Sequence, residues 1–413
     1  MKKNIGRLFQ GDTATWTIFF LLCCISLIEV YSAGATLTYK SGNTFAPLVK
    51  QSGFLLMGTF AAITVHNIPC RWFRAIPLVG YPLSVVLLLA VLFGGVTEND
   101  ASRWIDLGFV SFQPSEIAKG VLVTTVAMVL MMFQTEKGAE RRAFKWIFWL
   151  TFIVCSLIFV ENFSTAAILA FVVYLMMILG RIAWMQILKF TAALALAGVL
   201  GFTALMAVPS EAGGEGILHR ASVWKGRIVS AIEHKEISPK DYDLDKHAQE
   251  GYSNIAIASS HIVGKGPGNS TMRDFLPQAF SDFIYAIIIE EFGLWGGAVV
   301  LMLYLWLLVR CGRIANRCKG VFPALLIMGL SLMLVIQALF NMAVAVGLAP
   351  VTGQPLPLIS RGGTSTLITC VYFGMILSVS RYAPRQRGSE AAEAAVSPIS
   401  ADETAFQTEA DLD

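Results

Sequence analysis

Ten apolar stretches, each long enough to cross a lipid bilayer, constrain the fold of this chain more than any other feature. A transmembrane helix needs about 20 mostly apolar residues. Such stretches lie at approximately residues 15–33, 50–67, 76–95, 115–133, 144–160, 164–180, 187–208, 283–309, 321–347 and 363–380. The sequence therefore predicts an all-α polytopic membrane protein with ten transmembrane helices.

The composition agrees with this fold class. Hydrophobic residues make up 55% of the 413 residues and charged residues 14%, whereas soluble domains carry about 25% charged residues. This balance excludes a soluble multidomain enzyme and a disordered chain. The net charge of +3 is too small, and the basic residues are too scattered, for a nucleic-acid binder.

The first apolar stretch has two interpretations. Lys2, Lys3 and Arg7 precede it, and residues 32–35 resemble a signal-peptide cleavage site. Because nine further stretches follow, we expect an uncleaved first helix instead.

The loops between the stretches indicate how the chain crosses the membrane. Every second loop is rich in lysine and arginine, and short cationic loops stay on the cytoplasmic side. We therefore expect both termini in the cytoplasm and the long polar segment 209–282, between helices seven and eight, outside the membrane. Residues 1–384 then form the transmembrane domain, and the acidic tail 385–413 is expected to be disordered and cytoplasmic. On this topology the seven cysteines offer no outer-loop disulfide.

Asp282 stands where the long polar segment meets an apolar helix. Aspartate at such a position often caps the helix, because its carboxylate accepts hydrogen bonds from unpaired amides. The alternative is a general base at the membrane surface, where partial burial brings the pKa of a carboxylate towards its working pH. Four of the five histidines lie in the same segment, but none has a partner at metal-ligand spacing, so we expect no metal site there.

Glutamates also occur inside predicted helices, where their cost is high. Glu290 and Glu291 follow Asp282 in the eighth stretch, about 12 Å along the helix axis. At that distance they do not form a shared-proton dyad with Asp282, and a buried structural ion pair is expected. In the fourth stretch, Glu116 and Lys119 share one helix face at i, i+3. They either neutralise each other or face a substrate.

The segment 350–365 contains three prolines and three glycines in an apolar setting, so it cannot form a regular helix. Irregular backbone at membrane depth is tolerated where it is buried in protein or lines a cavity. Ser360, Arg361, Gly362 and Gly363 precede the tenth helix, whose N-terminal amides favour anions. A simple glycine hinge is the competing interpretation. Before the fourth helix, Arg103 stands beside Trp104, an aromatic typical of the membrane interface.

Together these segments resemble the SEDS (shape, elongation, division and sporulation) family, the group of FtsW, RodA and SpoVE, over about residues 10–382. Four motifs carry the resemblance in matching order: Arg103-Trp104-Ile105; Gln113-Pro114-Ser115-Glu116 with Lys119; Phe275-Leu276-Pro277 with Asp282-Phe283-Ile284; and residues 353–365. The resemblance implies a peptidoglycan glycosyltransferase that polymerises lipid II, the undecaprenyl-pyrophosphate-linked disaccharide peptide, outside the cytoplasmic membrane.

The resemblance also implies partners and roles. The family works with a cognate class B penicillin-binding protein and, in division, with other divisome proteins; no nucleic acid is involved. The family's essential outer-loop aspartate matches Asp282, which favours the general base over the cap. Arg103, Glu116, Lys119 and the 360–363 run are then expected to bind substrate, and Glu290 and Glu291 to support the site. Whether a divalent cation such as Mg²⁺ takes part stays open.

Three positions depart from the family pattern. The family's Pro-Asp-Phe-Gly-Thr motif is Glu161-Asn162-Phe163-Ser164-Thr165 here, so asparagine replaces its acidic residue. A family tyrosine is Arg361, and a glutamate after the Leu-Pro pair is Gln278. These departures weaken the carry-over of family roles to those three positions.

Alternative functions remain open from the sequence. Residues 352–355 and the acidic tail favour a septal, FtsW-type polymerase over a RodA-type polymerase for cell elongation. A lipid II flippase is a second class of function, with Glu116 and Lys119 along its pathway. A pure scaffold explains neither these charged residues nor Asp282.

Overall fold

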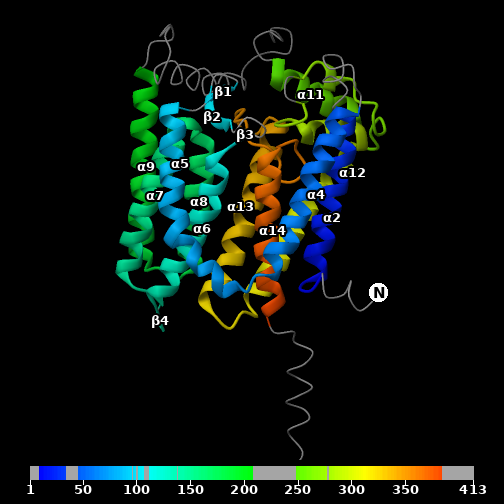
Figure 1. Ribbon diagram of the computed structural model, residues 1–413. Helices are drawn as coiled ribbons and strands as arrows, with labels where there is room; N and C mark the ends of the chain where they lie inside the picture. Colours follow the sequence, from blue (N-terminus) through cyan, green and yellow to red (C-terminus); the bar gives the residue numbers. More distant parts are fainter. Residues whose placement is uncertain are drawn as a thin grey trace, which may run out of the picture.

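The computed structural model describes residues 9–33, 45–94, 96–98, 101–106, 111–136, 138–207, 248–276 and 279–383, and within them it is a bundle of long helices (Figure 1). The long helices are α2 (Thr13–Ala33), α4 (Ala46–Asn67), α5 (Ile76–Gly94), α6 (Pro114–Met132), α7 (Arg141–Glu161), α8 (Phe163–Leu179), α9 (Trp184–Ala207), α12 (Ile284–Ala315), α13 (Val321–Ala345) and α14 (Thr364–Tyr382). One of these helices coincides with each predicted apolar stretch.

Eight helices of the described residues are long and apolar enough to cross a membrane. α8, with 17 residues, is a shorter apolar helix, and α14 is not among the eight. A multi-pass membrane protein is therefore confirmed, while the count of ten spans stays a proposal. The predicted acidic tail lies outside the described residues.

Shorter elements that the sequence analysis did not predict lie between the helices. They are the antiparallel sheet β1 (Val96–Glu98), β2 (Ala101–Asp106) and β3 (Ser111–Phe112), the hairpin β4 (Gln134–Thr135) and β5 (Gly138–Ala139), the helix α11 (Ala248–Ser260), and the 3₁₀ turns η1 (Cys70–Ala75) and η2 (Met272–Asp274). Figure 1 shows β1–β3 and α11 at the same end of the bundle, which we call the α11 end.

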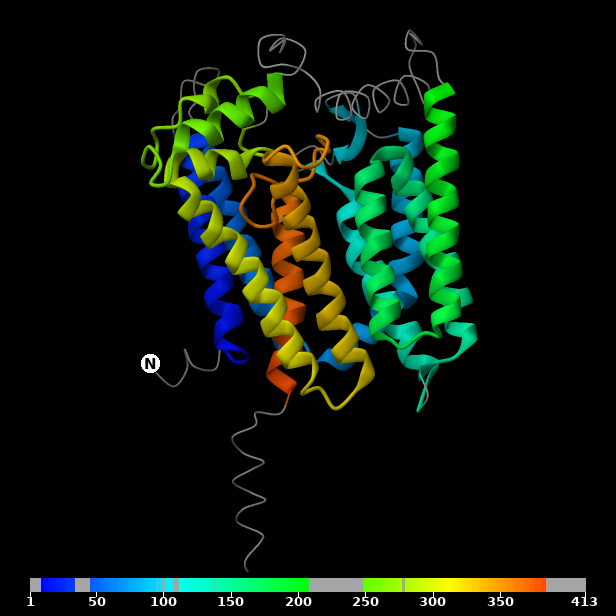
Figure 2. The same ribbon diagram turned by 180° about the vertical axis from the view of Figure 1, so that it is seen from behind.

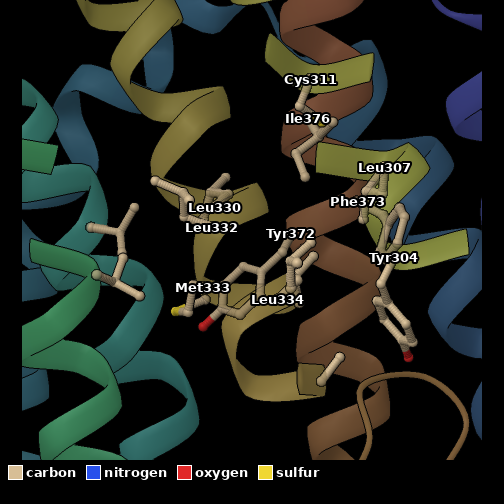
Figure 3. Packing of buried hydrophobic residues seen from close by; sticks show 14 of the residues in the cluster. Tyr304, Leu307, Cys311, Leu330, Leu332, Met333, Leu334, Tyr372, Phe373 and Ile376 are labelled. Carbon is tan, nitrogen blue, oxygen red and sulfur yellow. The ribbon is translucent and has the colours of Figure 1, made fainter. Parts of the chain in front are cut away.

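The core of the bundle forms around α13. This helix packs against α12 on one side and against α6 and α8 on the other, while α14 packs against α4 (Figure 2). Apolar side chains from all these helices join in one buried cluster, and Figure 3 shows Tyr304 of α12 and Tyr372 of α14 within it. The seven cysteines all lie within the described ranges and are free thiols in the structure.

α12 is broken near its start. Gly293 has φ 70° and ψ −172°, which is not helical, so the 284–292 segment is a separate short helix. The break leaves carbonyl groups without helical partners, and the loop after α11 supplies donors to two of them. The amide of Lys265 donates to the Glu290 carbonyl at 3.0 Å, and that of Gly266 to the Glu291 carbonyl at 2.8 Å.

The opposite end of the bundle ties the start of α2 to α12 and α14. The Arg310 guanidinium donates from Nε to both carboxylate oxygens of Asp12 at 2.9 Å. The amide of Asp12 donates to Ser380 Oγ at 3.0 Å. The start of α2 and the end of α14 therefore lie on the same side of the bundle, and the cytoplasmic location of that side stays a prediction.

Candidate active site

Asp282 lies at the α11 end, one residue before the N-cap position of α12. That position belongs to Phe283, which makes no side-chain capping bond. The Asp282 side chain is half-buried, and Ser281 Oγ donates to its Oδ1 at 3.0 Å. The carboxylate therefore combines partial burial with access from the surface, which is what a general base requires.

The 350–363 loop holds the backbone around Asp282. Its residues are irregular, as their prolines and glycines predict. The amide of Arg361 donates to the Phe280 carbonyl at 3.0 Å, and Ser360 Oγ donates to the Ser281 carbonyl at 2.6 Å. These two bonds fix the segment immediately before the carboxylate.

The loop is itself buried among the helices. Leu356, Leu358 and Ile359 are each at most 2% exposed. Polar groups of two helices satisfy its carbonyls: Ser26 Oγ of α2 donates to Ile359 at 3.0 Å, and the Tyr304 hydroxyl of α12 donates to Pro357. Irregular backbone thus lies in the protein interior with internal partners, as predicted.

Glu116 and Lys119 form the expected pair near the start of α6. Lys119 Nζ lies 2.9 Å from Glu116 Oε1, and the two side chains are 2% and 6% exposed. Pro114 occupies the first turn of α6, where its missing amide hydrogen costs nothing. The Tyr372 hydroxyl of α14 donates to the Glu116 carbonyl, and it accepts from the Gly120 amide at 3.0 Å.

Two amide side chains of α13 connect this ion pair to the loop and to Asp282. Lys119 Nζ donates to Gln337 Oε1 at 2.9 Å, and Gln337 Nε2 donates to the Pro355 carbonyl at 3.1 Å. Asn341 Nδ2 donates to the carbonyls of Asp282 at 2.9 Å and Gln354 at 2.7 Å. We call Gln337 and Asn341 the amide pair.

The Asn162 departure from the family motif has a local explanation. Asn162 is the N-cap of α8, and its side-chain oxygen accepts from the amides of Ser164 at 3.0 Å and Thr165 at 3.2 Å. Asparagine and aspartate cap helices about equally well. The Thr165 hydroxyl in turn accepts from Gln354 Nε2 at 2.6 Å, so this cap adjoins the 350–363 loop.

Glu290 binds the loop that precedes Asp282 and forms a partly buried ion pair with Lys265, whereas Glu291 contacts α2. Glu290 accepts from Lys265 Nζ at 2.6 Å, from the Thr271 amide at 3.0 Å and from Ser270 Oγ. Glu291 accepts from Ser32 Oγ of α2. Glu290 therefore supports the 265–272 backbone, and Glu291 ties the short helix 284–292 to α2.

The remaining predicted residues are placed in part. Arg103 lies in β2, but its side chain is outside the described part of the chain, as is Gln278. The Arg361 guanidinium stacks over the Phe280 ring, 5.3 Å from its centroid. Because the Arg361 amide bonds the Phe280 carbonyl and the Ser360 amide bonds Leu356, neither is open to an anion. Gly363 has φ 50°, which favours glycine.

Four members of this polar network were not predicted as site residues from the sequence: Thr165, Gln337, Asn341 and Gln354. For Gln337 and Asn341 a signal was available. They are two amides at i, i+4 inside an otherwise apolar stretch, and polar residues in such stretches usually face the protein interior. Within the residues that the structure describes, no group of three or more His, Cys, Asp or Glu side chains is arranged to hold a metal ion.

The chain is similar over most of its length to bacterial proteins of cell-wall synthesis. The family model described as "Cell cycle protein" (FTSW_RODA_SPOVE) matches residues 12–385. A probable peptidoglycan glycosyltransferase FtsW of Nitrosomonas europaea is 30% identical over 386 residues, covering 89% of this chain and 92% of that protein. Peptidoglycan glycosyltransferase MrdB of Escherichia coli K12 is 29% identical over 382 residues, covering 92% of this chain and 95% of that protein.

Solved structures share the fold. A chain from a study of the "structural coordination of polymerization and crosslinking by a peptidoglycan synthase complex" is 25% identical, with TM-score 0.71, over 91% of this chain and 99% of that one. The rod shape determining protein RodA of Thermus thermophilus is 24% identical, with TM-score 0.61, over 91% of this chain and 98% of that one.

Proposed function

Because the chain belongs to the FtsW, RodA and SpoVE family of cell cycle proteins, we propose that it is a peptidoglycan glycosyltransferase that polymerises lipid II at the outer face of the cytoplasmic membrane. Asp282 is the general base of this proposal. The observation that carries it is the position of Asp282: a half-buried carboxylate at the α11 end, with its backbone held by α13 and the 350–363 loop.

The reaction assigns a clear task to a carboxylate. An acceptor hydroxyl oxygen attacks the anomeric carbon of an α-linked lipid donor, the bond from that carbon to the pyrophosphate breaks, and the β-1,4 link forms with inversion. Asp282 takes the proton of the attacking hydroxyl. The departing pyrophosphate carries several negative charges, which preorganised cations stabilise. Lys119 and Arg103 are the proposed cations, with Arg361 as a weaker contributor.

The membrane arrangement of the proposal has ten spans with both termini in the cytoplasm. The segment between α9 and α12 and the α11 end then face outwards, where lipid II is polymerised. A class B penicillin-binding protein is the proposed partner, and the similar chain from a peptidoglycan synthase complex supports such an assembly. A septal, FtsW-type role with divisome proteins is the further proposal. Relatives named FtsW and MrdB match at 30% and 29% identity, so identity does not separate the two roles.

Transport of lipid II between the leaflets is the second candidate function. The observation that favours it is the Glu116–Lys119 pair, because buried charges inside a helix bundle are typical of transport pathways. A flippase moves the substrate without forming glycan.

The test is glycan formation from lipid II by the purified protein with its class B partner. Asp282→Asn should lower the rate by about 10²–10⁴-fold, the usual contribution of general-base catalysis. Asp274→Asn is a matched control, because Asp274 lies in the same outer segment with a side chain 48% exposed. The Asp274 variant should retain wild-type activity. A folded Asp282→Asn protein with more than about a tenth of wild-type activity would refute the base assignment.

The same preparation in liposomes separates the candidate functions. Movement of labelled lipid II across the bilayer without glycan formation would contradict the polymerase function and support the flippase function. Glycan formation by the wild-type protein supports the polymerase.

A further inference from the structure

The amide pair of α13 occupies one helix face. Gln337 and Asn341 are four residues apart, so their side chains are neighbours on that face. They are 5% and 1% exposed. Gln337 contacts the Lys119 ammonium, and Asn341 contacts the backbone carbonyl of Asp282. Both also contact the same loop, through the successive carbonyls of Gln354 and Pro355.

The two contacts of Asn341 fix the orientation of its amide. Both partners, the carbonyls of Asp282 and Gln354, are acceptors only, so the NH₂ group must face them. Each of its two hydrogens then serves one carbonyl. An aspartate of the same size has no such pair of donors, so no isosteric carboxylate can replace this contact.

Gln337 uses both ends of its amide. Its oxygen accepts from the Lys119 ammonium, and its nitrogen donates to the Pro355 carbonyl. A glutamate at this position would keep the contact to Lys119 but lose the donor to the loop. The substitution Gln337→Glu therefore separates the contact with Lys119 from the contact with the loop.

We propose that Gln337 and Asn341 are positioning residues that set the distance between Asp282 and Lys119 by holding the 350–363 loop between them. The inference rests on the proposed polymerase, in which a base at the acceptor and a cation at the leaving group act on the same sugar. Neither amide touches the reacting atoms. Both act by holding Asp282 and Lys119 in place. A displacement of such a group by about 1 Å can lower the rate about 100-fold.

The test compares variants of the amide pair with a variant of a buried polar residue outside the network. Gln337→Met and Asn341→Asp remove the donors to the loop, and Gln337→Glu removes one donor while preserving volume. Ser84→Ala is the control, because Ser84 of α5 is 1% exposed and donates to the Tyr81 carbonyl of its own helix at 2.8 Å. The full-length proteins are assayed with the class B partner on lipid II, and kcat is normalised to the folded fraction measured by size-exclusion chromatography.

We expect kcat to fall by about 10–100-fold in the amide-pair variants, with KM for lipid II within about twofold of the wild type. Ser84→Ala should keep the wild-type kcat after normalisation, because a purely structural loss only reduces the amount of folded protein. If Gln337→Met does not fold, Gln337→Glu still tests whether the hydrogen bond from Gln337 to the loop is needed for kcat. Wild-type kcat in folded Gln337→Glu or Asn341→Asp protein overturns the inference.

A double variant supplies a second readout. If Gln337 acts through Lys119, Gln337→Met adds little to the loss already caused by Lys119→Met, because residues of one unit are not additive. If Gln337 is only structural, the two losses multiply, and that outcome overturns the inference. Failure of the proposed function is seen separately, because wild-type protein would then form no glycan, and the inference would fall with it.

Discussion

Gly264 packs directly against Gly293, where the loop after α11 meets the break in α12. A Cβ on Gly264 would lie 2.3 Å from the Gly293 nitrogen, and one on Gly293 would lie 2.2 Å from the Ile262 carbonyl oxygen. Both glycines have positive φ, 81° and 70°. The close contact brings the amides of Lys265 and Gly266 to the carbonyls of Glu290 and Glu291. It therefore joins the loop after α11 and the short helix that follows Asp282 into one unit.

Substituting either glycine should destabilise this unit. Gly264→Ala or Gly293→Ala places a Cβ against backbone atoms that cannot move aside, and positive φ alone costs a non-glycine residue about 1–3 kcal/mol. We expect a lower thermal unfolding temperature in detergent. Gly53→Ala is the control: Gly53 lies within α4 with nothing within 4 Å of an added Cβ, so alanine should be neutral or stabilising. Wild-type unfolding temperatures for both loop variants would contradict the close contact.

The long helices were predictable because each has about 20 apolar residues, a signal that depends only on local composition. The break at Gly293 was not, because a single glycine in an apolar stretch is common in membrane helices and only its contact with Gly264 makes it special. The strands β1–β3 are two to six residues long and carry no clear alternation. The helix α11 lies in a segment whose polarity indicated only a loop.

The candidate site was predictable in its parts and not in its connections. Glu116 and Lys119 share a face by helix geometry alone, so their pairing follows from a spacing of three residues. Their link to Asp282 runs through Gln337, Asn341 and carbonyl groups of the 350–363 loop. Carbonyl groups leave no signature in a sequence, because every residue has one. Tertiary packing alone determines which of them meet.

Single and double variants of the Glu116–Lys119 pair can distinguish a structural role of the pair from a functional one. Removing one partner of a buried pair leaves an uncompensated charge, which costs about 3–5 kcal/mol. We expect Glu116→Gln alone to lower the unfolding temperature and the yield of folded protein. The double variant Glu116→Gln, Lys119→Met should recover stability, because no charge remains buried. If Lys119 binds the pyrophosphate, the double variant stays inactive in glycan formation, whereas full activity would show that the pair is only structural.

Two buried glutamates should respond differently to replacement by glutamine. Glu290 accepts from Lys265, Ser270 and Thr271, so Glu290→Gln should destabilise the protein by about 2–4 kcal/mol. Within the described residues, neither carboxyl oxygen of Glu29 has a hydrogen-bond partner. An unpaired buried carboxyl is costly, so Glu29→Gln should leave stability unchanged or raise it. Chemical or thermal unfolding of the two variants side by side measures this difference, and equal losses would contradict it.

The ion pair of Asp12 and Arg310 predicts a specific pH dependence of stability. Burial raises the pKa of the Asp12 carboxyl, but the hydrogen bonds from Arg310 and Thr15 outweigh burial and hold this pKa below its usual value. The unfolded chain has a pKa of about 3.9 at this position. The stabilisation is therefore fully present above about pH 5 and is lost as the pH falls through the lower folded-state pKa.

Asp12→Asn removes the charge and one acceptor of this contact while keeping a side chain that can cap α2. We expect the variant to unfold at a lower temperature than the wild type, by a constant difference between pH 8 and pH 5. Below about pH 4 the difference should shrink, because the wild-type carboxylate becomes protonated and loses its attraction to Arg310. Thermal unfolding in detergent between pH 3 and pH 8 measures the difference. A difference that stays constant down to pH 3 would mean that the charge of Asp12 does not stabilise the junction of α2 and α12.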